Sequence, residues 1–405
     1  MATNNNNKTL NVPHLRFPEF TGEWKKVLLG QIANITKGNG ISKEQLSDQG
    51  TPCILYGELY TKYKSEIINE IYSKTTLNSS ALVKSQANDV IIPCSGETAI
   101  DISTARCVPY NDVLLGGDLN IIRLKSQNGG FFAYQLNGVR KHDIACIAQG
   151  VSVVHLYGEN LKRIKVCYPS IEEQRKITSL LSLIDERIAT QNKIIEKYES
   201  LIQAIIYQKK TDGIRKGNWQ KTELSKVLQE SNEKNINGYT VCSVSVSQGV
   251  INQIEYLGRS FAAKETSHYN VVKYGDIVYT KSPTGDFPYG IVKRSYIKNA
   301  VAVSPLYGVY KPIKDNIGVI LHFYFMQPNN AFNYLHPLIQ KGAKNTINIT
   351  NERFLENSIP FPKTEDEIVY IANVLTSIQK KINIEKSLLQ SYEKEKQYLL
   401  RQMFI

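Results

Sequence analysis

The sequence repeats its own layout after about 195 residues. A tryptophan begins each copy, at Trp24 and at Trp219, and a proline leads into a long apolar-patterned segment, at Pro169 and at Pro362. An internal repeat is sought first because it fixes the architecture on which every other motif must be placed. The order globular, helical, globular, helical therefore predicts two similar halves with two similar tasks.

Both long segments carry a heptad pattern, in which apolar residues recur at alternating spacings of three and four. Sustained over about four heptads, this 3.5-residue period is what coiled-coil packing requires. The two patterns superpose after a shift of 194 residues, and their exceptions correspond, since Gln191 aligns with Glu385 and Tyr198 with Tyr392. The predicted seam consists of Ile177, Leu181, Ile184, Ile188, Gln191, Ile195, Tyr198, Ile202 and Ile205, and of Ile371, Leu375, Ile378, Ile382, Glu385, Leu389, Tyr392, Lys396 and Leu399.

An ordinary amphipathic helix lying on its own domain is the alternative for each segment. Such helices average about three turns, whereas each of these segments has room for roughly 35 residues, or about 50 Å of helix. The first segment is expected to stop at Thr211-Asp212-Gly213, with glycine just past its end. The length of the two segments favours a pair of helices that act as a spacer.

The globular parts carry short β-favouring runs bounded by glycine, proline, aspartate or asparagine, such as 90–93 and 277–279. The predicted fold class is α+β, with two target-recognition domains of mixed α/β structure separated by two long antiparallel coiled-coil helices and related by an internal pseudo-twofold repeat. The expected boundaries are 1–13 for a flexible N-terminus, 14–168 for domain 1, 169–212 for the central helix, 213–361 for domain 2 and 362–405 for the C-terminal helix.

The chain is basic, with a net charge of +12 and a pI near 9.1. A basic balance of this size suggests a polyanionic partner, either nucleic acid or an anionic membrane surface. The sequence contains no apolar run near the roughly 18 residues that a membrane-spanning helix needs, and residues 1–7 do not resemble a secretion signal. We therefore expect a cytoplasmic protein.

Short catalytic motifs are absent from the sequence. It contains neither a G-x-x-x-x-G-K-[ST] phosphate loop nor H-E-x-x-H nor G-x-S-x-G, and its six histidines are dispersed. The six cysteines, without any C-x-x-C pair, predict no zinc site and no disulfide framework. We expect no catalytic residue, no metal and no cofactor bound by this chain, which favours binding over catalysis.

Two passages give the sequence a recognisable character. The first runs from Val12-Pro13-His14 through Phe20 to Trp24, and the second is Tyr168-Pro169-Ser170-Ile171-Glu172-Glu173-Gln174, in which three residues separate the proline from the Glu-Gln pair. Together with the duplication, they resemble the DNA specificity subunit of type I restriction-modification systems. In the second half Glu-Gln is replaced and one residue is inserted before Ile371, which leaves the register of the second helix start open.

The resemblance implies two target-recognition domains that read the two parts of a bipartite, asymmetric sequence in double-stranded DNA. It also implies that the helical pair sets the gap between these parts and docks modification subunits, two in number, which carry S-adenosylmethionine and methylate adenine. Restriction subunits with ATP and Mg would join this core. The bases recognised and the length of the gap do not follow from the sequence.

Candidate DNA contacts are cationic or polar residues in the loops of each globular part. Lysine suits phosphate, whereas amide, hydroxyl and carboxylate groups suit base edges. A solvated loop side chain is the alternative for each. The candidates in domain 1 are Lys37, Asn39, Lys43, Tyr60, Lys62, Ser95, Glu97, Gln149, Ser152 and His155, and those in domain 2 are Lys281, Ser282, Thr284, Asp286, Lys341, Lys344 and Asn345.

Two rival functions remain open. One is a non-catalytic coiled-coil adaptor that binds no specific DNA and is basic by coincidence. The other is an enzyme with an unfamiliar nuclease or methyltransferase site, which would show turnover or bind S-adenosylmethionine as a purified chain.

Overall fold

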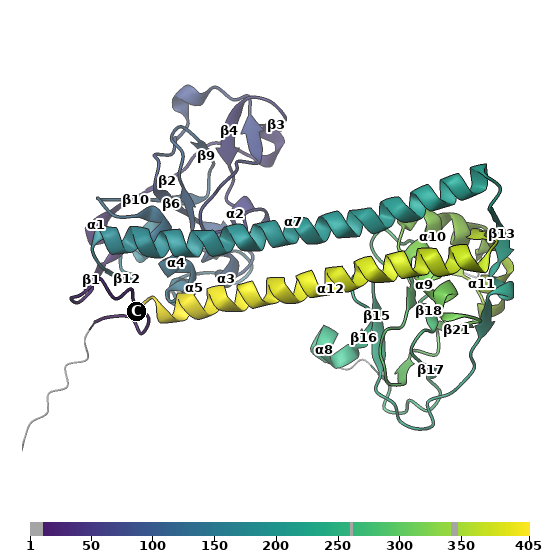
Figure 1. Cartoon of the computed structure of the whole chain (residues 1–405). Helices are drawn as coiled ribbons and strands as arrows, with labels where there is room; N and C mark the ends of the chain where they lie inside the picture. The colour runs from purple at the N-terminus through teal and green to yellow at the C-terminus, as the bar shows by residue number, and fades with distance from the viewer. Residues whose placement is uncertain (1–10, 260–261, 342–346) are drawn as a thin grey trace, which may run out of the picture. The chain divides into compact units, whose positions relative to one another are not determined.

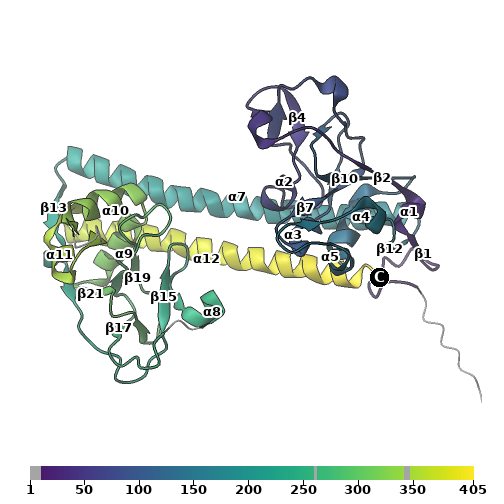
Figure 2. The same cartoon turned by 180° about the vertical axis from the view of Figure 1, so that it is seen from behind.

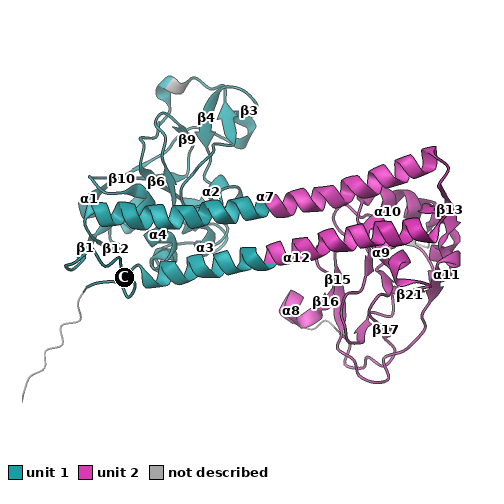
Figure 3. Cartoon of the chain, in the orientation of Figure 1, with its two compact units in different colours: residues 1–192, 387–405 teal, residues 193–386 magenta. Residues whose placement is uncertain are grey.

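The protein consists of two compact units, each holding part of both long helices (Figure 3). A computed structural model describes residues 11–259, 262–341 and 347–405. Unit 1 comprises residues 1–192 and 387–405, and unit 2 comprises residues 193–386. Unit 2 is therefore continuous in sequence, whereas unit 1 is assembled from both ends of the chain.

The long helices are α7, Ile171–Arg215, and α12, Glu365–Gln402, of 45 and 38 residues. Acidic side chains occupy the first turn of each and an arginine the last, an arrangement that complements the helix dipole. In unit 1 the start of α7 lies beside the end of α12, and in unit 2 the end of α7 lies beside the start of α12 (Figures 1 and 2). The predicted fold class, mixed α and β structure with a long antiparallel helix pair, is confirmed.

The first helix does not stop at Asp212, as the glycine signal suggested, but continues through Gly213 to Arg215. The glycine has a packing role, because a Cβ added at Gly213 would lie 2.0 Å from Cδ1 of Trp219. Arg215 then donates to the Asp212 carboxylate at 2.7 Å within the last turn. Glycine here admits the indole ring and does not end the helix.

Both helices start two to three residues after their proline, because a hydroxyl side chain caps each start. The backbone N–H of Glu173 donates to Ser170 Oγ, and that of Glu367 donates to Thr364 Oγ1, each at 3.4 Å. These capped starts are related by the same 194-residue shift as the seams. The inserted residue is Lys363, which separates Pro362 from the cap.

The two units share their sheet plan. In each, a four-stranded antiparallel sheet has equivalent strand order, β2-β10-β6-β8 in unit 1 and β14-β21-β18-β19 in unit 2. A separate two-stranded ribbon joins the first strand of each half to the strand before the long helix, β1 with β12 and β13 with β24.

Unit 1 has short helices and strands before α7. Their bounds are β1 Lys25–Leu28, α1 Leu29–Ile32, β2 Ala33–Lys37, β3 Leu46–Ser47, β4 Thr51–Ile54, α2 Glu58–Thr61, β5 Ser73–Thr75, β6 Asp89–Pro93, β7 Ser95–Gly96, α3 Ala99–Ile102, β8 Arg106–Val108, β9 Leu114–Leu115, β10 Leu119–Leu124, α4 Gly129–Asn137, α5 Lys141–Cys146, β11 Val154–His155, α6 Gly158–Leu161 and β12 Lys165–Tyr168.

Unit 2 follows a similar sequence of elements between α7 and α12. Their bounds are β13 Trp219–Glu223, β14 Leu228–Glu230, β15 Cys242–Ser245, β16 Gly249–Asn252, α8 Gln253–Leu257, β17 Asn270–Val272, β18 Ile277–Tyr279, β19 Val292–Arg294, β20 Val301–Val303, β21 Gly308–Pro312, α9 Asp315–Phe325, α10 Pro328–Leu335, β22 Gln340–Lys341, β23 Ile347–Asn348, α11 Asn351–Glu356 and β24 Ser358–Pro362.

Strands β6 and β18 begin with the same turn. Asn88 and Gly275 adopt positive φ angles of 82° and 93°, which asparagine and glycine tolerate best. The aspartate that follows each, Asp89 or Asp276, accepts a 2.8 Å hydrogen bond from the backbone N–H three residues earlier. This shared device shows that the repeat extends from the helices into the globular parts.

The main core of unit 1 draws on the start of α7 and on the end of the chain. Ile177 and Leu181 of α7 pack in one cluster with Phe131, Met403 and Phe404, all at most 3% exposed. Full burial of such side chains is worth about 1.5–3 kcal/mol each. Unit 2 instead stacks Phe354 between other rings of its own domain, such as Tyr279 at 4.8 Å between centroids.

Candidate nucleic-acid interface

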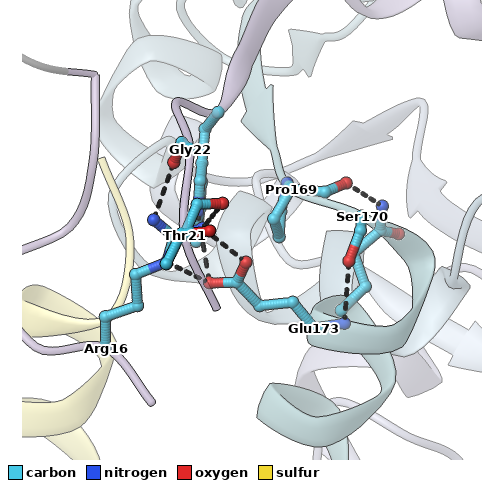
Figure 4. Close-up of polar contacts among 8 residues, drawn as sticks. Arg16, Thr21, Gly22, Pro169, Ser170 and Glu173 are labelled. Atoms are coloured by element: carbon cyan, nitrogen blue, oxygen red, sulfur yellow. Dashed lines mark hydrogen bonds and ion pairs between the residues drawn. The ribbon is translucent and has the colours of Figure 1, made fainter. Parts of the chain in front are cut away.

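A glutamate on each long helix joins the helix to the tryptophan that opens its half. Glu173 accepts from Trp24 Nε1 at 3.3 Å, and Glu367 accepts from Trp219 Nε1 at 3.0 Å. In unit 1 the Arg16 guanidinium adds two 2.8 Å bonds to the Glu173 carboxylate (Figure 4). The motifs that carried the sequence resemblance thus form the joint between helix and domain.

Two loops of unit 1 that are far apart in sequence come together where β7 pairs with β11. Ser95 lies opposite His155 in this ladder. The backbone of Gln149 closes the second loop by bonds to and from His155, at 2.9 and 2.7 Å. The structure thereby brings five candidates into one region, namely Ser95, Glu97, Gln149, Ser152 and His155, of which Ser95 is buried and the others are exposed.

Tyr60 and Lys37 border the same region. A Cβ added at Gly96 would lie 3.6 Å from the Tyr60 hydroxyl, which places the phenol beside β7. Burial raises the pKa of Tyr60, and the neighbouring charges of Asp101 and Glu97 act in the same direction. Burial also raises the pKa of the Cys94 thiol to about 11, against the opposing charge of Lys37. Lys37 itself is exposed.

The three remaining candidates of unit 1 lie near a second four-stranded sheet, of strand order β3-β5-β4-β9. The Asn39 amide donates to Ala81 O at 3.1 Å and accepts from Val83 N–H at 3.0 Å, so it holds a loop. The Lys62 ammonium contacts the Glu58 carboxylate at 2.6 Å. Lys43 is exposed in a short turn at 43–45. The sequence could not reveal that Asn39 and Lys62 already have partners.

Four candidates of unit 2 share the loop between β18 and β19. Lys281 is half-buried, has a positive φ of 61°, and has a pKa lowered by burial. Ser282, Thr284 and Asp286 are exposed, and mutual backbone bonds between Thr284 and Phe287 close the turn. The side chains of the other three candidates are not described. Lys341 is placed only by its backbone in β22, and Lys344 and Asn345 lie outside the described residues.

Comparison with known proteins gives these loops a context. Residues 21–200 match the family model described as the type I restriction modification DNA specificity domain. This part of the chain is therefore similar to a type I restriction-modification DNA specificity domain. The matched span contains the first helix joint and both loops of unit 1. The resemblance predicted from the sequence, and with it a role in DNA sequence specificity, is confirmed.

Solved structures share the fold of this chain over nearly its whole length. One is the S subunit of a type I restriction-modification system from M. genitalium, with a TM-score of 0.61 and 13% identity, covering 97% of this chain and 99% of that one. Another belongs to a structural description of complex assembly and conformational transition of the type I R-M system. Its TM-score is 0.50 and its identity 14%, and the match covers 94% of this chain and 97% of that one. The description of the matched family names DNA specificity, which agrees with the predicted non-catalytic role.

The predicted seam residues are buried or half-buried in the two units. The two tyrosines that occupy equivalent seam positions also have equivalent cationic neighbours in the structure. Tyr392 lies 6.0 Å from the Arg187 guanidinium in unit 1, and Tyr198 lies 6.0 Å from the Lys381 ammonium in unit 2. The two pairs are related by the 194-residue shift. Burial is complete or nearly so at Ile177, Leu181, Ile184, Gln191, Ile195, Ile202, Ile371, Leu375 and Ile382, and partial at Ile188, Tyr198, Ile205, Ile378, Glu385, Leu389, Tyr392, Lys396 and Leu399.

Lys396 of this seam is the centre of an ionic cluster that the sequence did not reveal. Its ammonium contacts Glu66 at 2.5 Å and Asp185 of α7 at 2.6 Å, and both carboxylates are less than a tenth exposed. The Tyr134 hydroxyl donates to Asp185 at 2.8 Å. We call Lys396, Glu66 and Asp185 the buried triad. The buried triad links the globular part of unit 1, through Glu66, to α7 and α12.

The protonation of the buried triad reflects two carboxylates that share one ammonium. Burial and the charge of Glu66 raise the pKa of Asp185 to about 6. For Lys396, burial disfavours the cation, but the charges of Glu66 and Asp185 prevail and raise its pKa. For Glu66, burial is likewise outweighed, here by Lys396, so its pKa falls.

Other kinds of site find no support in the described part of the chain. No group of three or more His, Cys, Asp or Glu residues could hold a metal ion within it. No helix among the same residues is long and apolar enough to cross a membrane. All six cysteines are free.

Proposed function

We propose that this chain reads a bipartite sequence in double-stranded DNA, with residues 14–168 recognising one half-site and residues 213–361 the other. The observation that carries this proposal is one scaffold built twice with different loops. Both units have the same sheet order and the same tryptophan–glutamate joint. The connections at equivalent places, 94–105 between β6 and β8 and 280–291 between β18 and β19, differ in sequence and structure, because the first contains β7 and α3 whereas the described residues of the second form no helix or strand.

The helical pair then sets the distance between the half-sites and provides the docking surface for modification subunits, two per complex. At 1.5 Å per residue, the 45 residues of α7 extend for about 68 Å. S-adenosylmethionine belongs to these partners, and ATP and Mg to restriction subunits that join them in a cytoplasmic complex. This chain contributes the address and leaves the chemistry to its partners.

The positive charge supports DNA as the ligand. A net charge of +12 favours association with a polyanion through release of its counterions, and this term depends steeply on salt. Specificity must come in addition, from side chains that reach base edges. The exposed loop residues near β7 and β11 are suited to that role.

Sequencing that detects methylated adenine tests the proposal. Genomic DNA from cells with this chain and its modification subunit is compared with DNA from cells that lack only this chain. A split methylated motif that depends on the chain is the expected result. A soluble complex of the two proteins without any such motif would favour the adaptor, and methylation or cleavage by the purified chain alone would favour an enzyme.

A further inference from the structure

The loop that follows α5 in unit 1 is a small closed finger. Backbone bonds at 2.9 and 2.7 Å join Gln149 and His155, and the next residue, Leu156, donates to Cys94 O at 2.7 Å. Gly150 has a φ of +119°, and a Cβ added there would lie 2.1 Å from Val153 O. Only glycine fits this tight turn, so the finger has a defined shape.

The finger presents an aliphatic side chain to solvent. Val151 at its tip is 97% exposed, against 52% for Val153, whereas Val154 at its base is buried. The base is held by pairing of β11 with β7, which packs beside α3 (Figure 2). A β-branched side chain on a fixed turn loses little further rotational freedom when a ligand covers it.

The finger carries no charge. From residue 147 to residue 157 the sequence contains no Lys, Arg, Asp or Glu, although the chain is 21% charged. Phosphate contacts in DNA complexes rely largely on lysine and arginine, so an uncharged finger in a DNA specificity domain is not built to hold the backbone. Its exposed groups include an amide at Gln149, a hydroxyl at Ser152 and the Val151 methyls, which are suited to base edges.

Base edges offer few apolar groups for such a tip. In the major groove, thymine presents a C5 methyl group beside the O4 acceptor, and the adenine paired with it presents a donor and an acceptor that a glutamine amide can bind together. Larger side chains than valine serve as wedges between base steps. The size of Val151 and the position of Gln149 on the same finger therefore match an A·T pair read from the major groove.

We propose that Val151 is a specificity-determining residue that contacts the C5 methyl group of a thymine in the half-site read by residues 14–168. This inference rests on the proposed function and deepens it, because it names one base pair of the target and the atom that is read.

The test removes the thymine methyl group from the DNA and the Val151 side chain from the protein, separately and together. Once the half-sites are known, the complex of this chain with its modification subunit is titrated with duplexes in which single thymines of the half-site are replaced by uracil, which lacks the methyl. Loss of one buried methyl is expected to weaken binding about fourfold at one position. In the Val151→Ser variant, uracil and thymine at that position should bind equally.

Val153→Ser is the matched control, because it makes the same change on the same finger and should retain the thymine preference. Val151 is so exposed that its substitution should leave the melting temperature unchanged. The valine contact is overturned if the half-site lacks an A·T pair, if no uracil substitution weakens binding, or if the weakening persists in Val151→Ser. Weaker assembly with the modification subunit at unchanged thymine preference would also overturn it. Wild-type complex that binds the half-site duplex no more tightly than a duplex of scrambled sequence would instead overturn the proposed function itself.

Discussion

The two units place opposite chemistry at equivalent points of their helix seams. In unit 1, Lys396 meets Asp185 and Glu66 in the buried triad. The 194-residue shift relates Lys396 to Ile202, which is 3% exposed, and Asp185 to Gln379, which bonds to Asn383 along its own helix at 3.0 Å. A shared backbone plan therefore does not require a shared means of holding the helices.

The two units differ in how strictly they fix the register of α12 against α7, more than in how strongly they hold the two helices together. Apolar seam residues tolerate a slip by one heptad, because another apolar residue takes the place of the first. A buried ammonium tolerates none, since a slip leaves it without its carboxylates. We infer that the buried triad fixes the register of α12 against α7 in unit 1, and that unit 2 follows because both helices are continuous.

An insertion of one heptad into α7 alone, after Asn192, should break this relation most severely. The buried triad keeps unit 1 in register, so the mismatch falls on unit 2, whose seam must repair or open. Hydrogen exchange should accelerate in residues 193–210 and 365–386 and change little in 171–185. A matched insertion in α12, before Ser387, should restore protection and lengthen the gap between half-sites.

If the doubly inserted protein is stable but methylates its motif with the original gap, the spacer proposal fails. Faster exchange confined to 171–185 in the single insertion would instead mean that the buried triad yields first.

Removal of the triad cation should come next in size. Lys396→Met leaves Glu66 and Asp185 buried without their counterion and should cost about 3–5 kcal/mol of unfolding free energy, measured by urea denaturation. The matched change Ile202→Met in unit 2 exchanges one apolar side chain for another and should cost less than about 1.5 kcal/mol. A triple variant, Lys396→Met with Glu66→Gln and Asp185→Asn, should recover much of the loss. Equal costs for Lys396→Met and Ile202→Met would contradict the comparison.

The stability of unit 1 should depend on pH through Asp185. Its folded pKa of about 6 lies above the value of about 3.9 in an unfolded chain, so the folded state binds more protons between these values. Stability relative to Asp185→Asn should therefore fall as pH rises from about 4 to about 6, by up to about 3 kcal/mol, and level off above. Urea titrations at several pH values measure this difference. A relative stability that rises with pH would show that the carboxylate is stabilised by Lys396 more than it is penalised by burial.

The tryptophan joints should show the smallest difference. Glu173→Gln weakens a buried bidentate pair with Arg16 and should cost about 2 kcal/mol, whereas Glu367→Gln changes a single bond from Trp219 and should cost about 0.5–1 kcal/mol. Hydrogen exchange near each joint reports the local effect. Equal losses at both joints would mean that Arg16 adds nothing to the first.

Local sequence patterns were sufficient for the helices and insufficient for their partners. The seam was predictable because a 3.5-residue period depends only on nearby residues. The buried triad was not, since Glu66 lies 330 positions from Lys396 and nothing local marks the contact. The glycine signal at Gly213 predicts a helix stop because that signal is local, whereas the reason for this glycine is the distant ring of Trp219.

The candidate interface shows the same limit. Gln149 and Ser152 were predicted from polarity alone, and only the pairing of β7 with β11 shows that they share a region with Glu97. Asn39 satisfied the same criterion, yet its amide holds a loop. Which polar side chain is free to read a base depends on tertiary hydrogen bonds that the sequence does not display.

The discontinuity of unit 1 has a consequence for the order of events during synthesis. Domains usually fold as they emerge from the ribosome, the N-terminal one first. Here the core of unit 1 includes Met403 and Phe404, and Lys396 must arrive before Glu66 and Asp185 are neutralised. Residues 193–386 are continuous and complete earlier. The first half of the chain to be translated is therefore the last to reach its final structure, and until then its unpaired helix and open core leave apolar surface exposed.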